Sequence, residues 1–154
     1  MVNGVEFKIG TVANDVICGQ IRASASVASP VYARLPAAQQ FLGDQGPQPL
    51  SNLSRLLATK DEETVGFADF NRLDGYVKML FVLPAWQGRG IAGELLARAA
   101  EASLAPLNLR TQAVNDGALG FYLRHGFKVV AGAVEANWHG ARVVWLSLRQ
   151  DDDG

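Results

Sequence analysis

The stretch MLFVLPAWQGRGIAGELLARAAEA, residues 79–102, decides the fold of this 154-residue chain. Its apolar start is typical of the end of a buried strand, and its second half has the periodicity of an amphipathic helix over 88–103. The apolar face of that helix carries Ile91, Leu95, Ala99 and Ala102. Residues 87–93 lie between the two elements, where the unpaired N–H groups and the dipole of a helix start attract anions. The stretch therefore predicts a phosphate-binding turn.

The glycines of this turn have two further interpretations. Gly88 and Gly90 let the backbone approach phosphate oxygens closely, and Arg89 would add a cation. Residues 88–93 also satisfy the G-x-G-x-x-G pattern of nicotinamide dinucleotide sites, but those sites need a long parallel sheet and an acidic residue about 20 positions later. The next predicted strand, 107–113, has no acidic residue. A turn that serves only helix packing would not explain why glycines, an arginine and a helix start coincide.

The segments before the turn predict one helix and several antiparallel strands. Residues 5–11 alternate in polarity like a half-buried strand, and helical spacing begins at Asn14 or Asp15 as N-cap and ends before Pro30. Residues 29–50 are rich in proline and glycine, which favours a loop with a short helix near 37–42. Three extended segments then predict an antiparallel meander: 54–60, 64–70 and 76–82.

The segments after the turn predict a parallel crossover. Residues 107–113 alternate again and can pair in parallel with the strand that ends at Val82, because a long helix separates them. Asn115 or Asp116 would cap a short helix that ends at Gly126. Two more strands, 127–135 and 141–149, flank a turn at 137–140, and the acidic tail 150–154 is expected to be disordered. We predict a single domain over residues 1–149.

Composition excludes several classes of function. Hydrophobic residues make up 49% and charged residues 19%, which is typical of a folded globular protein. The 14 basic and 15 acidic residues form no basic block, so no nucleic-acid partner is expected. Cys18 is the single cysteine, which excludes an internal disulfide and a cysteine metal cluster and suits a reducing compartment. Neither a signal peptide nor a bilayer-spanning run is present in the sequence, so we expect a cytoplasmic protein without a membrane partner.

Two motifs together resemble the GNAT superfamily of N-acetyltransferases. The signature of that family is Arg/Gln-x-x-Gly-x-Gly/Ala after the fourth strand, and Gln87, Gly90 and Ala92 match it. Residues 121–127, FYLRHGF, resemble the family's F-Y-x-x-x-G-F run. The resemblance covers roughly residues 64–130. It implies an α/β (α+β) fold with a mixed, mostly antiparallel sheet of about seven strands, about four helices, and a splayed parallel strand pair that forms a coenzyme A cleft.

The resemblance also implies acetyl-CoA as co-substrate and assigns residues to it. The backbone of Phe81 and Val82 would contact the pantetheine arm, and Asn115 would contact the same arm. Tyr122 matches the position that assists the departing thiolate, although an aromatic core residue beside Phe121 would show the same pattern. The pyrophosphate would bind the turn formed by Gln87, Gly88, Arg89, Gly90, Ile91 and Ala92.

The catalytic base cannot be assigned from the sequence. A primary amine with a pKa near 10.4 is only about 0.04% neutral at pH 7, so forming the nucleophile costs about 4 to 5 kcal/mol without help. The family commonly uses a glutamate near the fourth or fifth strand, yet residues 76–82 and 107–113 contain no carboxylate. Asp69, His139 or a water chain are the alternatives. His125 is interpreted as a helix-end residue that interacts with the dipole, and Cys18 as a core residue.

The acceptor and the class of protein also have alternatives. The resemblance implies direct attack, in a ternary complex, by a primary amine of a small molecule or a peptide. Residues 29–53 and the final hairpin would bind this acceptor. The missing carboxylate motivates a second hypothesis, a catalytically inactive CoA-binding sensor. A different acyl-CoA and a homodimer are both compatible with the sequence.

Overall fold

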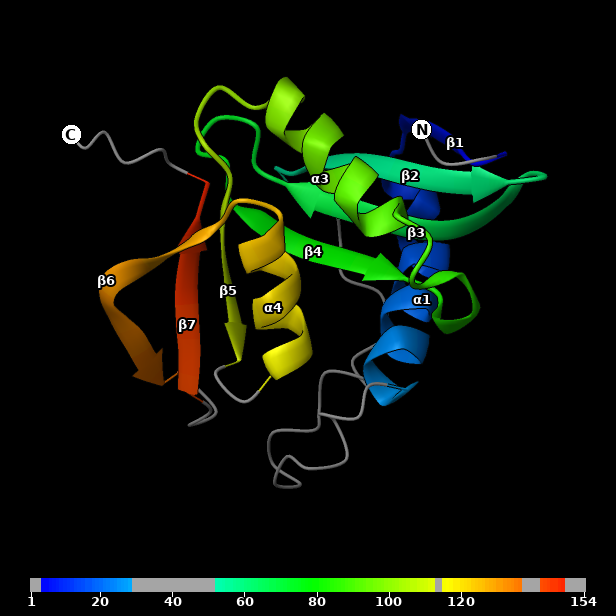
Figure 1. Cartoon of the computed structure of the whole chain (residues 1–154). Coiled ribbons are helices and arrows are strands. Elements are labelled where there is room, and N and C mark those ends of the chain that lie inside the picture. The colour runs from blue at the N-terminus through cyan, green and yellow to red at the C-terminus, as the bar shows by residue number, and fades with distance from the viewer. Residues whose placement is uncertain (1–3, 29–51, 113–114, 137–141, 149–154) are drawn as a thin grey trace.

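The computed structural model describes residues 4–28, 52–112, 115–136 and 142–148, and Figure 1 shows their arrangement. The helical elements are η1 (Val12–Asn14), α1 (Asp15–Ala28), η4 (Pro84–Trp86), α3 (Ile91–Ala102) and α4 (Asp116–Arg124). The strands are β1 (Glu6–Ile9), β2 (Ser54–Lys60), β3 (Glu63–Phe70), β4 (Val77–Val82), β5 (Asn108–Gln112), β6 (Lys128–Ala136) and β7 (Arg142–Ser147). This is the mixed α+β class that the sequence predicts.

The strands form two sheets. The first has the order β1-β2-β3-β4 with antiparallel neighbours, which confirms the predicted meander. Asp61 and Glu62 connect β2 to β3 and both have positive φ. A two-residue hairpin turn of type I′, which matches the right-handed twist of the strands, requires this. The second sheet has the order β5-β7-β6 and is also antiparallel.

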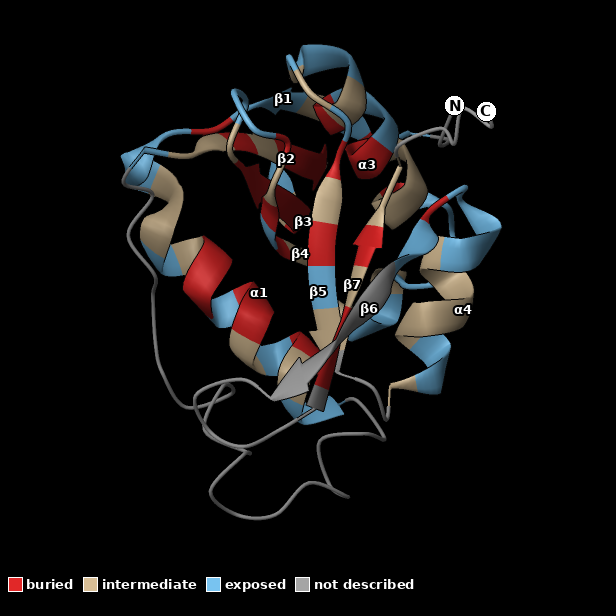
Figure 2. Ribbon diagram, turned by 90° about the vertical axis from the view of Figure 1, so that its left-hand side faces the viewer, coloured by how far each residue is buried: buried red, intermediate tan, exposed pale blue. Residues whose placement is uncertain are grey.

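Helices α1 and α3 cover opposite faces of the first sheet, and Figure 2 shows buried ribbon where they meet it. Cys18 and Ile21 of α1 pack on Phe67 and Met79 of the sheet. The cluster on the α3 face contains Val65, Ala68, Val82, Ile91 and Leu95. The predicted apolar face of α3 is confirmed at Ile91, Leu95 and Ala99, whereas Ala102 at the helix end is exposed.

Buried side chains of the two sheets pack in one cluster, which includes Val77 of β4 and Leu146 of β7, but backbone pairing between the sheets is confined to one bridge in the described chain. A parallel bridge joins Tyr76 to Asn108, where Asn108 N donates to Gly75 O at 2.9 Å. Beyond this bridge, β4 and β5 share no ladder among the described residues. The predicted parallel relation of these two strands is therefore confirmed at their start, and the strands separate afterwards, as the family resemblance implies.

The structure corrects several boundaries. Strand β1 is shorter than predicted, because it ends at Ile9, and the Ile9 side chain is 81% exposed. Helix α1 does not begin with a cap at Asn14 or Asp15; Thr11 instead caps the preceding turn η1, and Asn14 completes a capping box. The described residues contain seven strands and three α-helices, and the predicted short helix near 37–42 lies outside them. The predictions for 29–50, 137–140 and 150–154 lie outside the described residues.

Candidate active site

A cleft of about 700 Å³ lies beside the end of β4. Its walls come from four elements that are far apart in the sequence: α1, β4, the start of α3, and α4. The volume falls within the usual range for small-molecule sites. Of the residues assigned from the sequence, Phe81, Val82, Gln87, Gly88, Gly90, Ile91, Ala92, Asn115 and Tyr122 line this cleft.

The glycine turn has the backbone conformation that its residues predict. Gly88 and Gly90 have φ of +79° and +87°, in the left-handed region that favours glycine. Gln87 fixes the start of the turn, because its Nε2 donates to Val82 O at 3.0 Å. This hydrogen bond thus folds the loop back on the end of β4.

The N–H groups of residues 88–93 have no acceptor among the residues that the structure describes. Helical hydrogen bonding starts only at Glu94, whose N donates to Gly90 O at 3.1 Å. Free amides at the start of a helix, on the wall of a cleft, form a site for an anion. The structure therefore has unpaired backbone amides where the sequence predicts an anion site, and binding of an anion there stays a prediction.

Strand β4 presents free backbone groups to the same cleft. Leu83 N donates to Val65 O at 2.8 Å, and Phe81 is paired with Phe67. Hydrogen-bonded positions alternate along an antiparallel ladder, so Phe81 bonds toward β3, whereas the N–H and C=O of Leu80 and the N–H of Val82 point toward β5. The Val82 C=O already accepts from Gln87 Nε2. The register thus favours Leu80 and Val82 for backbone contact with an extended ligand.

Arg89 is placed differently from the other turn residues. Its guanidinium carbon lies 4.7 Å from the centre of the Trp86 ring, and Nη2 donates to Ala85 O at 3.3 Å. Arg89 is not among the residues that line the cleft, although Trp86 is. In this conformation the anion site depends on amides and not on the predicted cation.

Helix α4 supplies the opposite wall. Asn115 is its N-cap, as one of the two predicted alternatives, and its Oδ1 accepts from Ala118 N at 3.0 Å. Its Nδ2 has no partner among the described residues, so a donor remains beside the cleft. The helix ends at Gly126, whose φ of +93° confirms the predicted glycine stop.

Tyr122 is both a packed aromatic residue and a cleft residue. Its ring meets Phe121 and Phe127 edge to face, with ring centres 5.2 and 5.3 Å apart. Burial raises the pKa of Tyr122 to about 12. The hydroxyl makes no hydrogen bond to any described residue, so this neutral donor is available to a ligand. The two interpretations from the sequence are therefore compatible.

Sequence reasoning missed several residues of the cleft. Ala25 and Ala28 come from the end of α1, and Leu80 could have been found from the strand alternation. Asp116 also places a carboxylate in the lining of the cleft. The sequence suggests only a helix cap there, because acidic residues are common in the first helical turn. His125 was assigned to the helix end, where its Nδ1 does meet Phe121 O at 2.8 Å, but it also lines the cleft.

The structure does not support Asp69 as the base. Its two carboxylate oxygens accept from Nε and Nη2 of Arg55 at 2.7 and 2.8 Å, and the residue is 2% exposed. It does not line the cleft. His139 lies outside the described residues. Within the described chain, no group of three or more histidine, cysteine, aspartate or glutamate residues could hold a metal ion.

Comparison with known proteins identifies the family. Residues 52–129 match the family model described as an acetyltransferase (GNAT) domain. The chain is 42% identical over 57 residues to the N-alpha-acetyltransferase MAK3 of Arabidopsis thaliana, an alignment that covers 34% of this chain and 30% of that protein. The chain thus spans less than a third of the length of this curated relative.

Solved structures share the fold. Apo-form YjaB from Escherichia coli has a TM-score of 0.73 at 18% identity, with 94% of this chain and 97% of that chain covered. A GNAT family acetyltransferase from Elizabethkingia anophelis with acetyl-CoA bound has a TM-score of 0.65 at 16% identity, with 96% and 99% covered. No helix among the described residues has the length and apolar character needed to cross a bilayer. The family match spans half of the chain and includes the glycine turn and α4, so the chain belongs to the GNAT acetyltransferase family.

Proposed function

We propose that this protein is an acetyl-CoA-dependent N-acetyltransferase that transfers the acetyl group to a primary amine. The observation that carries the proposal is the row of unpaired N–H groups at residues 88–93 on the wall of the cleft. Two features support acetyl-CoA as the donor: membership of the GNAT family, and a neighbour of the same fold that contains acetyl-CoA.

The residues of the cleft fit such a donor along its length. The amides of residues 88–93 match a pyrophosphate, and an added Cβ at Gly88 would meet nothing within 4 Å, so the approach to the turn is open. The outward N–H and C=O of Leu80 and the outward N–H of Val82 match the amides of a pantetheine arm, which would bind as an added strand does. Asn115 Nδ2 adds a donor on the opposite wall.

The reaction joins the amine nitrogen to the acetyl carbon and breaks the bond between that carbon and sulfur. Before attack the ammonium must lose a proton, and the leaving thiolate must be stabilised. The Tyr122 hydroxyl is suited to the second task as a hydrogen-bond donor. Full proton transfer from a phenol with a pKa near 12 to a thiolate whose acid has a pKa near 8.5 would be uphill by about 5 kcal/mol. A donated hydrogen bond is therefore the role that we assign.

The acceptor is proposed at the level of a primary amine on a small molecule or a peptide. The partly similar relative is named an N-alpha-acetyltransferase, which favours peptide N-termini as the first acceptors to test. Asp116 would offer a carboxylate to a cationic acceptor within the described part of the cleft.

The proposal is tested by incubating the protein with acetyl-CoA and a panel of small amines and peptides with free N-termini, while released thiol is followed with a chromogenic disulfide. Buried Cys18 should contribute no background signal. Acceptor-dependent thiol release and a product heavier by one acetyl group are expected. If neither appears and CoA still binds, the protein is the inactive CoA-binding sensor. Stabilisation by nicotinamide cofactors in place of CoA would contradict both hypotheses.

A further inference from the structure

The His125 ring lies against Gly93, and this contact joins the two helices that form the walls of the cleft. An ideal Cβ added to Gly93 would stand 2.7 Å from Nε2 and 3.3 Å from Cδ2 of His125. Ordinary van der Waals contact begins at about 3.4 Å. Gly93 belongs to the first turn of α3, and His125 caps the end of α4. The close approach therefore requires a residue without a side chain at position 93.

His125 is held too firmly to move away at no cost. Its Nδ1 lies 2.8 Å from Phe121 O, where an N–H donor completes the hydrogen bond. The ring also packs on the Phe121 ring, with centres 4.2 Å apart. Its backbone N is shared between the carbonyls of Phe121 and Tyr122, at 3.1 Å each. A Cβ at position 93 would consequently displace one helix relative to the other, or break these contacts.

Gly93 and His125 lie between the free amides and Tyr122, the two groups that one bound acetyl-CoA molecule would have to reach. The free amides end at Gly93, and Tyr122 lies one helical turn or less from His125 on α4. Both Gly93 and His125 line the cleft. The separation of α3 and α4 thus fixes how far the anion site lies from the Tyr122 hydroxyl.

We propose that Gly93 and His125 form a matched steric pair that sets the width of the cleft at its phosphate end. His125 acts as a positioning residue: its ring fills the space that a side chain at position 93 would need, and so sets the distance between α3 and α4. This inference rests on the proposed function, because the cleft width matters only if a ligand must reach both walls. A misplacement of about 1 Å between positioned groups can cost about 10²-fold in rate, so the distance between the walls matters.

The test is a double-mutant cycle on CoA affinity, measured by calorimetry on the full chain. Gly93→Ala is expected to weaken CoA binding about tenfold, since the added methyl group collides with the ring. His125→Ala should cost only a few fold. The double variant Gly93→Ala/His125→Ala should bind like His125→Ala alone, because the collision is gone. Gly93→Ala/His125→Phe keeps a ring there and should remain weak.

Matched controls separate the pair from general effects. Glu94→Ala changes a side chain on α3 whose ion-pair partner is Arg98; neither residue lines the cleft, so CoA affinity should be unchanged. Equal weakening in Gly93→Ala and the double variant would overturn the inference, since it would mean that the methyl group blocks the ligand directly. Unchanged affinity in Gly93→Ala would overturn it as well.

Failure of the proposed function gives a different result. If the wild-type protein does not bind CoA, the function is refuted before any variant is compared. The thermal midpoints of wild type, the two single alanine variants and the double alanine variant still report the contact. Gly93→Ala should melt earlier than wild type, and the double variant should melt at the temperature of His125→Ala. If Gly93→Ala does not fold, recovery of a folded protein in the double variant is the same rescue.

Discussion

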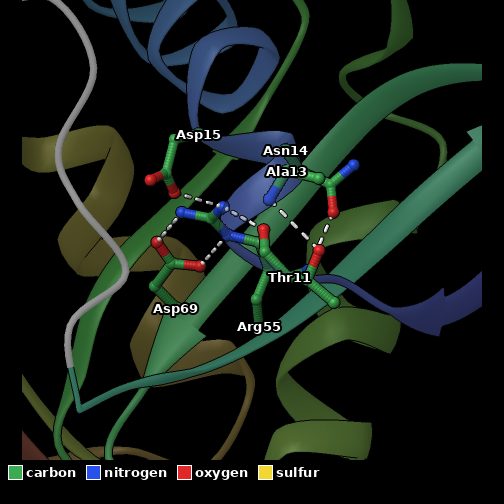
Figure 3. Close-up of polar contacts among 6 residues, drawn as sticks. All are labelled: Thr11, Ala13, Asn14, Asp15, Arg55 and Asp69. Carbon is green, nitrogen blue, oxygen red and sulfur yellow. Dashed lines mark hydrogen bonds and ion pairs between the residues drawn. The ribbon is translucent and has the colours of Figure 1, made fainter.

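Arg55 and Asp69 form a two-point ion pair inside the first sheet, with Nε to Oδ1 at 2.7 Å and Nη2 to Oδ2 at 2.8 Å. Both side chains are almost fully buried. The third nitrogen, Nη1, donates to Asp15 Oδ1 at 2.8 Å and to Thr11 O at 3.0 Å, as Figure 3 shows. One guanidinium thus joins β2 and β3 to the start of α1.

The surroundings of Arg55 explain why a buried cation is tolerated. Burial alone would lower its pKa, but the hydrogen bonds that Arg55 donates to Asp69 and Asp15 reverse this effect and hold the pKa above its usual value. Gly10 lies so close that an added Cβ would stand 2.8 Å from the Arg55 stem. The pair fixes α1, whose far end supplies Ala25 and Ala28 to the cleft.

We predict that Asp69→Ala lowers the free energy of unfolding by about 3 to 5 kcal/mol, because it leaves the buried Arg55 charge without its main partner. Denaturant unfolding measures the loss. The matched control is Glu94→Ala, which removes the exposed i,i+4 pair with Arg98, at 2.9 Å, and should cost about 0.5 kcal/mol or less. Similar losses in the two variants would contradict a special role for the buried pair.

The Cys18 thiol should be inert in the folded protein. It is 2% exposed, and burial raises its pKa to about 12, so almost no thiolate forms at neutral pH. Labelling with iodoacetamide at pH 8 is expected to be slow and to accelerate with denaturant as the protein unfolds. Rapid labelling of the native protein, at the rate of an unfolded control, would show that α1 does not pack as described.

Local sequence patterns predicted the elements around the site well. Strand 54–60 agrees with β2 at both ends, and the glycine turn, the α3 face and the Asn115 cap follow from periodicity and capping chemistry. Each of these signals is confined to a few neighbouring residues. They could therefore be recognised without knowledge of the tertiary structure.

Features that depend on contacts between distant segments could not be predicted in this way. Asp69 was a candidate base until the structure placed Arg55, 14 residues earlier in the chain, against both of its oxygens. Arg89 was expected at the phosphate site, but the Trp86 ring beside it offers a competing contact. Gly93 and His125 carried no joint signal, because only the packing of α3 against α4 brings them together.

Gly88 should be required for its backbone conformation. Its φ is +79° and an added Cβ would meet nothing within 4 Å, so Gly88→Ala should cost about 1 to 2 kcal/mol of stability from backbone strain alone. Gly88→Asn is the matched variant, because asparagine tolerates this region, and it should cost less despite its larger side chain. Denaturant unfolding compares the two. A greater loss in Gly88→Asn would show that bulk, and not conformation, decides.

Tyr122→Phe should lower kcat by about 10- to 100-fold once an acceptor is found, because one positioned donor to the leaving sulfur is lost. The affinity for CoA should change little, since the ring contacts with Phe121 and Phe127 remain. Steady-state kinetics with both substrates saturating measure the first effect, and calorimetry measures the second. An unchanged kcat would refute the assigned role of the hydroxyl.

Tyr122 should also make the folded protein sensitive to alkaline pH. The pKa of its phenol is about 12 in the folded protein and about 10 in the unfolded chain, so above pH 10 the unfolded state releases this proton first. Its contribution to stability is thus complete below pH 10 and falls by up to about 1.4 kcal/mol per pH unit between pH 10 and 12. Unfolding free energies of wild type and Tyr122→Phe at pH 9 and pH 11 test this, because the phenylalanine variant lacks the ionisable group and should lose less stability. Equal losses in the two proteins would mean that the Tyr122 hydroxyl is solvated and not buried.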